Sequence, residues 1–232
     1  MMSEILVGEA IDSTRDPFTP ESRRIVVVSG GLSESGSSAR LSRALAEAAS
    51  NYLSQRGVGA DVEVVELRPL AGAITDAMLT MNPATDLAKR LRAVREADGI
   101  IAVSPTFQAS YSGLFKSFWD LFEDPLSAKP VLLGATGGTA RHSLMIDYAM
   151  RPLFSYLRMD VLPSAVFAAA DDFGDVIDKN DGTRDAPLQE RIERAGAAFA
   201  KALMARPALG RAEADDRFKN VTPLEEMLGS IG

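Results

Sequence analysis

The chain has 232 residues, with 25 Lys and Arg against 32 Asp and Glu, which gives a formal net charge of −7. This length suffices for one α/β domain with a full core. The acidic balance argues against nucleic acid or an anionic membrane as the main partner, because both attract a basic face. The absence of Cys and the presence of a single His, His142, exclude disulfides, thiolate catalysis and cysteine metal sites. This leaves chemistry that a bound organic cofactor carries, with neither a catalytic side chain nor a metal assigned.

Targeting signals are not visible in the sequence. No apolar run approaches the roughly 18 residues that a membrane span requires. The N-terminal residues lack the basic and apolar segments of a secretory signal. We therefore expect a cytoplasmic protein without a membrane partner.

Apolar segments typical of buried strands alternate with helical patterns along the chain. Strands are predicted at 24–29, 60–67, 99–104, 130–135 and 161–168. Helices are predicted at 38–55, 87–97, 114–122, 141–158 and 188–203. The strand at 60–67 alternates in part, which places it nearer a sheet edge. The segment 69–83 is predicted to be an irregular connection in which Met78, Leu79 and Met81 fill gaps in the core.

This alternation indicates a parallel sheet covered by helices on both faces. We predict an α/β three-layer sandwich whose five-stranded parallel sheet has the flavodoxin-like order 2-1-3-4-5. No internal repeat or low-complexity linker divides the chain. The predicted division is an N-terminal arm at 1–22, one flavodoxin-like domain at 23–206 and a C-terminal tail at 207–232.

Hydroxyl groups and glycines follow the strand at 24–29. This first loop (29–38) reads Ser-Gly-Gly-Leu-Ser-Glu-Ser-Gly-Ser-Ser and leads into a predicted helix. Free N–H groups at a helix N-terminus, lined by hydroxyls, favour a bound phosphate. Ser37 and Ser38 suit plain helix caps equally well when taken alone. Two further loops, described next, favour the phosphate interpretation.

Two more strand ends carry small and hydroxyl residues. The second loop (104–113) reads Ser-Pro-Thr-Phe-Gln-Ala-Ser-Tyr-Ser-Gly, and the third loop (136–139) reads Thr-Gly-Gly-Thr. In the predicted strand order all three loops converge on one pocket beyond the carboxyl ends of the strands. The second loop offers backbone N–H groups beside Phe107, and the third lets the backbone approach a ring edge at Gly137 and Gly138. The three loops together predict a flat, phosphorylated ligand.

Other nucleotide motifs fit the sequence less well. The segment 31–38 has the glycine spacing of a P-loop, but Ser37 stands where that loop needs Lys. The G-x-G-x-x-G fingerprint of Rossmann dinucleotide sites is absent, as is the G-x-S-x-G elbow of α/β-hydrolases. A loop for a monophosphate, with hydroxyls and no lysine, fits best.

These motifs resemble those of the NADPH-dependent FMN reductase family of flavodoxin-like proteins over about 24–170. The segments that carry the resemblance are Ser29-Gly30-Gly31 through Ser38-Ala39-Arg40-Leu41, Ser104-Pro105-Thr106-Phe107, and Gly113-Leu114-Phe115-Lys116-Ser117-Phe118-Trp119-Asp120. Ala135-Thr136-Gly137-Gly138, followed by Arg141-His142-Ser143-Leu144, is similar to the subgroup that feeds reduced flavin to flavin-dependent monooxygenases. One departure is that the family's first loop usually has an Arg soon after its start, whereas 33–38 contains none and Arg40 comes late.

The resemblance implies a non-covalent FMN that accepts hydride from NADPH or NADH. The residues it implies in the phosphate loop are Ser29, Gly31, Ser37, Ser38 and Arg40. Those implied along the isoalloxazine ring are Pro105, Thr106, Phe107 and Gln108, with Thr136, Gly137 and Gly138 at its pyrimidine side. Hydride transfer between stacked rings requires no general acid or base from the protein.

Two other functions remain open at this point. One is a flavodoxin-like electron carrier that keeps its FMN, and the other is an FMN-bound quinone, azo-dye or chromate reductase. The resemblance also implies small-molecule substrates, a monooxygenase partner, and a homodimer or homotetramer. A subunit interface is expected on the helix at 114–122, whose aromatic residues occupy more than one face. These aromatic residues are Phe115, Phe118, Trp119 and Phe122.

Overall fold

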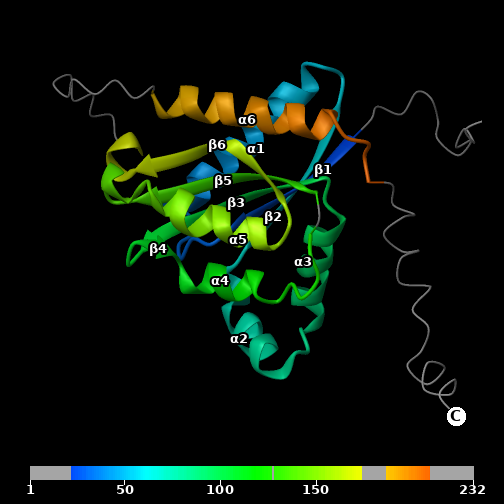
Figure 1. The fold of residues 1–232 in the computed structure, drawn as a ribbon, viewed down its shortest axis with the longest axis vertical. Coiled ribbons are helices and arrows are strands. Elements are labelled where there is room, and N and C mark those ends of the chain that lie inside the picture. Colours follow the sequence, from blue (N-terminus) through cyan, green and yellow to red (C-terminus); the bar gives the residue numbers. More distant parts are fainter. Residues whose placement is uncertain (1–21, 127, 174–186, 210–232) are drawn as a thin grey trace, which may run out of the picture.

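The computed structural model describes residues 22–126, 128–173 and 187–209 and shows a parallel sheet between two layers of helices (Figure 1). Five parallel strands lie in the order β2-β1-β3-β5-β6, and a short strand, β4, pairs antiparallel with β3. The strands are β1 (Ser22–Ser29), β2 (Gly59–Glu66), β3 (Gly99–Phe107), β4 (Ser110–Tyr111), β5 (Pro130–Gly137) and β6 (Asp160–Ala169). Apart from β4, the described strands are those predicted, so the order 2-1-3-4-5 is confirmed. The partly alternating strand, β2, lies at the predicted sheet edge.

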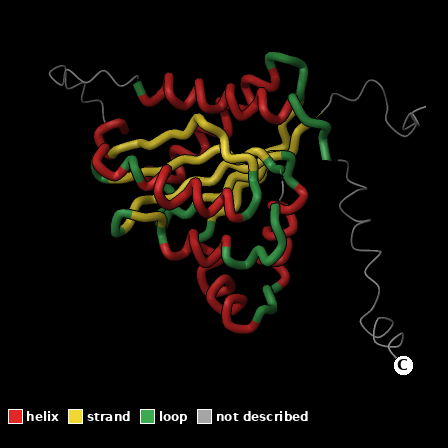
Figure 2. The backbone as a smooth tube through the Cα atoms, viewed as in Figure 1, coloured by secondary structure: helices red, strands yellow, loops and turns green. Residues whose placement is uncertain are grey.

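Helices connect successive parallel strands of the sheet, and a last helix follows β6 (Figure 2). They are α1 (Ser37–Ser54), α2 (Ala71–Thr80), α3 (Thr85–Glu96), α4 (Gly113–Trp119), α5 (Arg151–Tyr156) and α6 (Leu188–Met204). Short helical segments are η1 (Arg68–Leu70), η2 (Ala140–His142), η3 (Ile146–Met150) and η4 (Ala170–Phe173). In the described part of the chain, none of the helices has the length and apolar character needed to span a membrane.

The sheet buries both of its faces because its central strands are apolar at every position. Ile25 and Val27 of β1 point to the side covered by α1 and α6, and Val26 and Val28 point to the other side. That second side is covered by α2, α3, α4, η3 and α5. A strand buried on both faces has no polar alternation, which is why 24–29 reads as a continuous apolar run.

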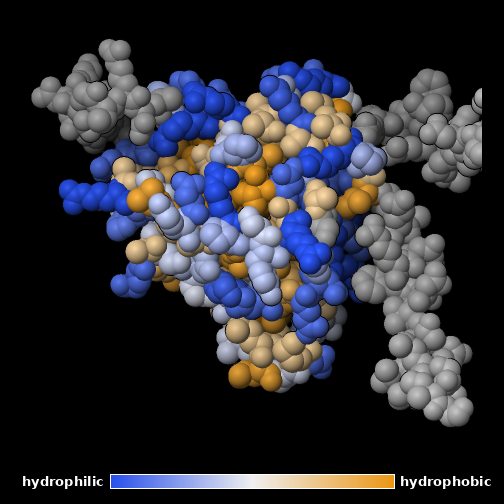
Figure 3. All heavy atoms as spheres, viewed as in Figure 1, coloured by the Kyte–Doolittle hydropathy of each residue, from blue (hydrophilic) through white to orange (hydrophobic). Residues whose placement is uncertain are grey.

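The segment 69–83 contains a helix, α2, so the prediction of an irregular connection was wrong. Its pattern is weak because only Ile74 and Ala77 of this ten-residue helix are buried. Leu79 and Met81 are 81% and 64% exposed, and Met78 is 42% exposed, so these side chains do not fill core gaps as predicted. Figure 3 shows apolar surface at the end of the molecule where Figure 1 places α2.

The helix predicted at 141–158 is broken into η2, η3 and α5. Pro152 lies in the first turn of α5 and has no N–H to donate to the carbonyl of residue 148. The turn before it, η3, is a π-helical turn, which accommodates one extra residue. The apolar spacing alone did not show this interruption.

The predicted arm and tail lie almost wholly outside the described residues. Ser22 is the first residue of β1, and the described chain resumes at 187 and ends at 209. Leu209 donates its backbone N–H to Asp98 Oδ1 at 2.6 Å, so the start of the predicted tail contacts the domain. The division at 22 and 207 stays a prediction.

Candidate functional site

The three loops predicted to form the site leave the same edge of the sheet. β1, β3 and β5 are adjacent and parallel, so their carboxyl ends at Ser29, Phe107 and Gly137 share that edge. Just past β1, Gly30 donates its backbone N–H to Val103 of β3 at 2.8 Å. The first loop therefore starts against the strand that leads into the second loop.

A pair of hydroxyls ties the first loop to the third. Ser38 Oγ and Thr136 Oγ1 lie 2.7 Å apart, and both residues are buried. Ser29 at the end of β1 is also buried, whereas Ser37 is partly exposed. The structure thus brings together most of the hydroxyl groups that the sequence analysis assigned to this edge.

The N-terminus of α1 opens toward the first loop. Its N-cap position is Gly36, which has no side chain with which to cap the helix. The first N–H groups of a helix have no partner within the helix, so they are available to a bound anion. A Cβ on Gly31 would lie 3.2 Å from Ser38 Cβ, so glycine lets the loop run close to the helix start.

Two serines that the sequence analysis did not assign hold the first and second loops together. Ser112 Oγ donates to the Gly30 carbonyl at 3.2 Å and accepts the Phe115 N–H, also at 3.2 Å. Ser104 Oγ accepts the Ser112 N–H at 3.0 Å. The available signal was Ser112 directly before a helix, a position typical of an N-cap. Its long-range bond to Gly30 has no sequence signature.

The second loop is a tight hairpin, because β3 continues past the predicted stop at Pro105. Pro105 pairs with Thr136 of β5, and its missing N–H faces the side where β1 has already ended. Phe107 then pairs with Ser110, which leaves Gln108 and Ala109 as the turn. Both turn residues have positive φ, of 49° and 63°. This geometry is normally supplied by Asn or Gly.

The second and third loops present further predicted residues at this edge. Thr106 Oγ1 is buried and has no hydrogen-bond partner among the described residues. Phe107 is 44% exposed. Gly137 packs closely on Phe167, because a Cβ there would lie 2.9 Å from the ring, whereas Gly138 has open space around it.

Arg40 stands apart from the other predicted phosphate residues. Its guanidinium carbon lies 4.8 Å from the centre of the Phe173 ring, in η4 beyond β6. This stacking resembles a cation–π contact. The assignment of Arg40 to the phosphate stays a prediction.

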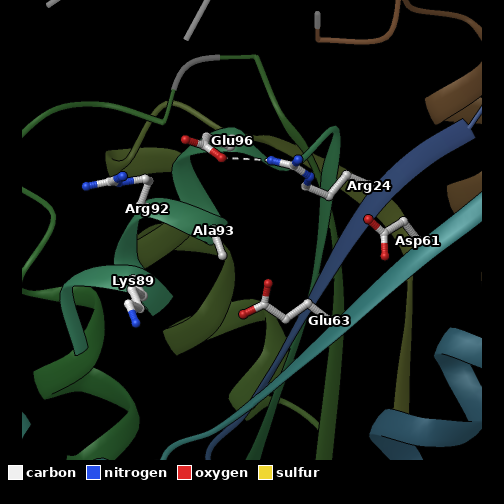
Figure 4. Close-up of a pocket in the computed structure, with 7 residues that line it drawn as sticks. All are labelled: Arg24, Asp61, Glu63, Lys89, Arg92, Ala93 and Glu96. Carbon is white, nitrogen blue, oxygen red and sulfur yellow. Dashed lines mark hydrogen bonds and ion pairs between the residues drawn. The ribbon is translucent and has the colours of Figure 1, made fainter. Parts of the chain in front are cut away.

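A hollow with mixed charges lies away from this edge (Figure 4). It opens between the first half of β1 and β2 and the helix α3, and Arg24 and Glu96 form a 2.8 Å ion pair across it. Its lining residues are Arg24, Asp61, Glu63, Lys89, Arg92, Ala93 and Glu96. Because its acidic and basic groups balance, it offers no net charge to a phosphate.

The aromatic residues of α4 do not form an interface, contrary to the prediction. Phe115, Phe118 and Trp119 are at most 1% exposed, and Phe122 just after the helix is 5% exposed. They pack edge-to-face on one another and on Phe154 of α5. Neighbouring helices of the same chain cover these aromatic side chains, for which the sequence pattern alone gave no packing partner.

Comparison with known proteins defines the class of this site. The model of the NADPH-dependent FMN reductase family matches residues 23–174. An NADH-dependent FMN reductase, SfnF, from Pseudomonas putida is 37% identical over 172 residues, which cover 74% of this chain and 88% of the relative. An FMN reductase (NADPH) from Escherichia coli (strain K12) is 35% identical over 154 residues, or 66% of this chain and 79% of the relative.

Solved structures agree with this result. An oxidoreductase from Corynebacterium diphtheriae has a TM-score of 0.73 at 37% identity and covers 81% of this chain and 100% of its own. The apo form of an NADH:FMN oxidoreductase, EMOB, has a TM-score of 0.65 at 25% identity, with 81% and 93% covered. A WrbA-like flavodoxin from Agrobacterium tumefaciens matches at 18% identity, with a TM-score of 0.53 and coverage of 82% and 100%. At that identity, it supports the fold alone.

The fold and the site edge are those of a flavodoxin-like α/β protein. Within that class, the chain belongs to the NADPH-dependent FMN reductase family, as the sequence analysis predicted. The oxidoreductase class and the pairing of FMN with a nicotinamide nucleotide are thereby confirmed at the level of the family. Two features of this structure suit FMN. They are the Thr106 hydroxyl, which has no partner in the described part of the chain, and the serine-lined start of α1 with Gly36 at its N-cap.

Proposed function

We propose that this protein uses NADH or NADPH to reduce FMN and passes the reduced flavin to a flavin-dependent monooxygenase. The observation that carries the proposal is the match of the family model to the segment 23–174, which contains all three loops. Relatives named for NADH and for NADPH both match, so the proposal includes both nucleotides.

The first loop and the start of α1 would hold the phosphate of FMN. Ser29, Ser37 and Ser38 offer hydroxyls there, and the first N–H groups of α1 add uncapped donors. Gly31 keeps the loop close to the helix. Arg40 would join them only after leaving the Phe173 ring.

The second and third loops would hold the isoalloxazine ring. The Thr106 hydroxyl, unpaired within the residues that the structure describes, could bond a polar edge atom, and Phe107 has an exposed aromatic face for stacking. Pro105 and Gln108 flank these two residues on the same hairpin. Gly138, Gly137 and the buried Thr136 would meet the pyrimidine side, where backbone groups approach without an intervening side chain.

The protein contributes orientation rather than acid or base chemistry. Bound FMN supplies the hydride-accepting ring, so no side chain has to transfer a proton at the reacting atoms. The hairpin and the serine ties between loops would fix the ring plane against which a nicotinamide stacks. Holding reacting groups near contact is worth a large part of the barrier to such a reaction.

Steady-state oxidation of NADPH and NADH, followed with and without added FMN, tests the proposal. We expect a rate that saturates with FMN and is negligible without it. A rate that ignores added FMN but needs a quinone, azo dye or chromate would show a reductase with permanently bound FMN. No oxidation under any of these conditions, with FMN retained through gel filtration, would show an electron carrier instead.

We also propose that the protein works as a homodimer or larger homo-oligomer in the cytoplasm. Tyr148 and Tyr156 are 79% and 86% exposed along the η3–α5 surface, beside a groove shared with α4. The groove also carries Lys116, Asp120 and Glu123. A face with both charge signs and exposed aromatics can complement a second copy of itself across a twofold axis. The cytoplasm supplies the NAD(P)H on which the activity depends.

A further inference from the structure

The first loop lacks a positive charge where a phosphate would lie. Between Gly30 and Ser38 the one charged residue is Glu34. A phosphate monoester carries close to two negative charges at neutral pH, and charge-assisted bonds to it are the strong ones. A cation that contacts the phosphate would therefore have to come from another part of the chain.

Arg68 lies beside this loop because it follows the end of the neighbouring strand, β2. β2 pairs with β1 up to Glu66 opposite Ser29, and Leu67 then donates its N–H to the Ser29 carbonyl at 3.1 Å. Arg68 follows at once as the first residue of η1. The backbone thus ties the base of Arg68 to the point where the first loop departs.

The side chains confirm this proximity. Arg68 Nη1 lies 3.9 Å from Glu34 Oε1, and the two side chains are 55% and 78% exposed. An exposed pair at this distance contributes little to stability, so the guanidinium is free to exchange its partner. Arg43 contacts the Glu34 backbone carbonyl instead, at 3.4 Å, and Arg40 stacks on Phe173.

We propose that Arg68 is the cationic ligand of the FMN phosphate and that Glu34 competes with the phosphate for it. This role rests on the proposed function, because it requires FMN at the first loop. A guanidinium can bind a phosphate through two parallel N–H groups, which a single carboxylate contact at 3.9 Å does not use. Glu34 in turn repels the phosphate, which weakens FMN binding and so favours an FMN that is released easily.

Binding of FMN and of riboflavin, measured by flavin fluorescence quenching without NAD(P)H, tests the role. Riboflavin has the same ring and no phosphate, so it separates the two parts of the site. We expect Arg68→Gln to weaken FMN binding about five- to tenfold and to leave riboflavin binding unchanged. Arg92→Gln removes the same charge from the exposed surface of α3 and should change neither dissociation constant.

Glu34→Gln should change the FMN affinity in the opposite direction. We expect it to tighten FMN binding about threefold, with a smaller gain when Arg68→Gln is already present, because part of the competition acts through Arg68. Arg68→Lys should recover part of the lost FMN affinity. Thermal unfolding of each variant without flavin checks that the fold is retained.

Three results would overturn the role of Arg68. Unchanged FMN binding in Arg68→Gln would show that Arg68 is not a phosphate ligand, and it would leave the proposed function intact. Equal losses for FMN and riboflavin would show a structural effect instead of a phosphate contact. A wild-type protein that binds neither flavin would remove the proposed function and the role of Arg68 together.

Discussion

At the scale of single residues, the hairpin turn of the second loop is the most unusual conformation near the site. Gln108 and Ala109 have φ of 49° and 63°, a region in which side chains with a Cβ are disfavoured. Strained backbone of this kind persists only when surrounding structure enforces it, and it gathers at functional sites. Here the β3–β4 pairing on either side enforces it.

Ala109→Gly should relieve part of this strain. We expect the free energy of unfolding to rise by about 0.5–1 kcal/mol, since glycine adopts positive φ without the Cβ clash. Urea unfolding followed by circular dichroism measures this change. Gly57→Ala is the converse control, because Gly57 has φ of 73° and open space around it, and it should lose about 1 kcal/mol. Lower stability in Ala109→Gly would contradict the strain argument.

Thr106→Val should change the stability of the fold and the affinity for FMN in opposite directions, because both depend on one hydroxyl group. The buried Thr106 hydroxyl has no partner among the described residues, so replacing it should stabilise the flavin-free protein by about 1 kcal/mol. The same change should weaken FMN binding about fivefold, because one hydrogen bond to the ring is lost. Urea unfolding and flavin titration measure the two effects, and Thr106→Ser should restore binding. A variant that binds FMN as tightly as wild type would remove Thr106 from the site.

Sequence reasoning placed these hydroxyl and glycine residues at one edge of the sheet, but it gave none of the contacts between them. Ser38 and Thr136 were each predicted from their own strand ends, and the structure joins them. The bond from Ser112 to Gly30 and the contact from Arg68 to Glu34 link distant segments. A single sequence contains no signal for such pairs, because each depends on strand register and on the path of a loop.

At the scale of elements, sequence periodicity succeeded where a helix or strand buries a long, regular face. α1 and α6 read correctly because each buries several residues at helical spacing. α2 was missed because its two buried residues are too few to make a pattern. The break at η3 was missed because its buried residues Ile146 and Met150, followed by Phe154 of α5, keep the four-residue spacing of an ordinary helix.

The contact between α1 and α6 depends on one glycine. A Cβ on Gly196 would lie 2.6 Å from Ala48 Cβ and 2.9 Å from the Ala48 backbone carbon. Helix propensity favours Gly196→Ala by about 1 kcal/mol, but backbone atoms cannot yield to the clash, so we expect a net loss of about 1–2 kcal/mol. Thermal and urea unfolding measure it. Gly72→Ala, in open space on α2, should instead gain about 0.5 kcal/mol. An increase in stability in both variants would show that α1 and α6 are not in close contact at Gly196.

At the scale of the whole molecule, alternation of element types was enough to predict the sheet. Right-handed crossovers and short connections leave few arrangements for five βα units, and the order β2-β1-β3-β5-β6 is one of the common ones. The expected interface on α4 was wrong because an amphipathic pattern does not say which neighbour covers a helix. The aromatic helix α4 is covered by its own chain, and the exposed tyrosines lie on η3 and α5.

Tyr156→Asp tests the proposed interface. We expect the subunit dissociation constant to rise at least about tenfold, because a charge replaces an aromatic group that the partner would bury. Light scattering after gel filtration over a range of concentrations measures it. Leu79→Asp is the matched control, since Leu79 is 81% exposed on α2. Dissociation by Leu79→Asp with no effect of Tyr156→Asp would place the interface at α2.

The packing of α6 on α1 also affects when the proposed flavin site gains structural support during translation. α1 starts at the first loop, directly after β1, whereas α6 follows β6 and is the last helix in the described residues. Until the ribosome has released α6, the side of α1 that packs on it and the sheet face over β5 and β6 lack their cover. A nascent chain that stops after β6 would therefore expose apolar surface to chaperones and proteases. The proposed flavin site of such a chain would have all of its residues but not the support of α6.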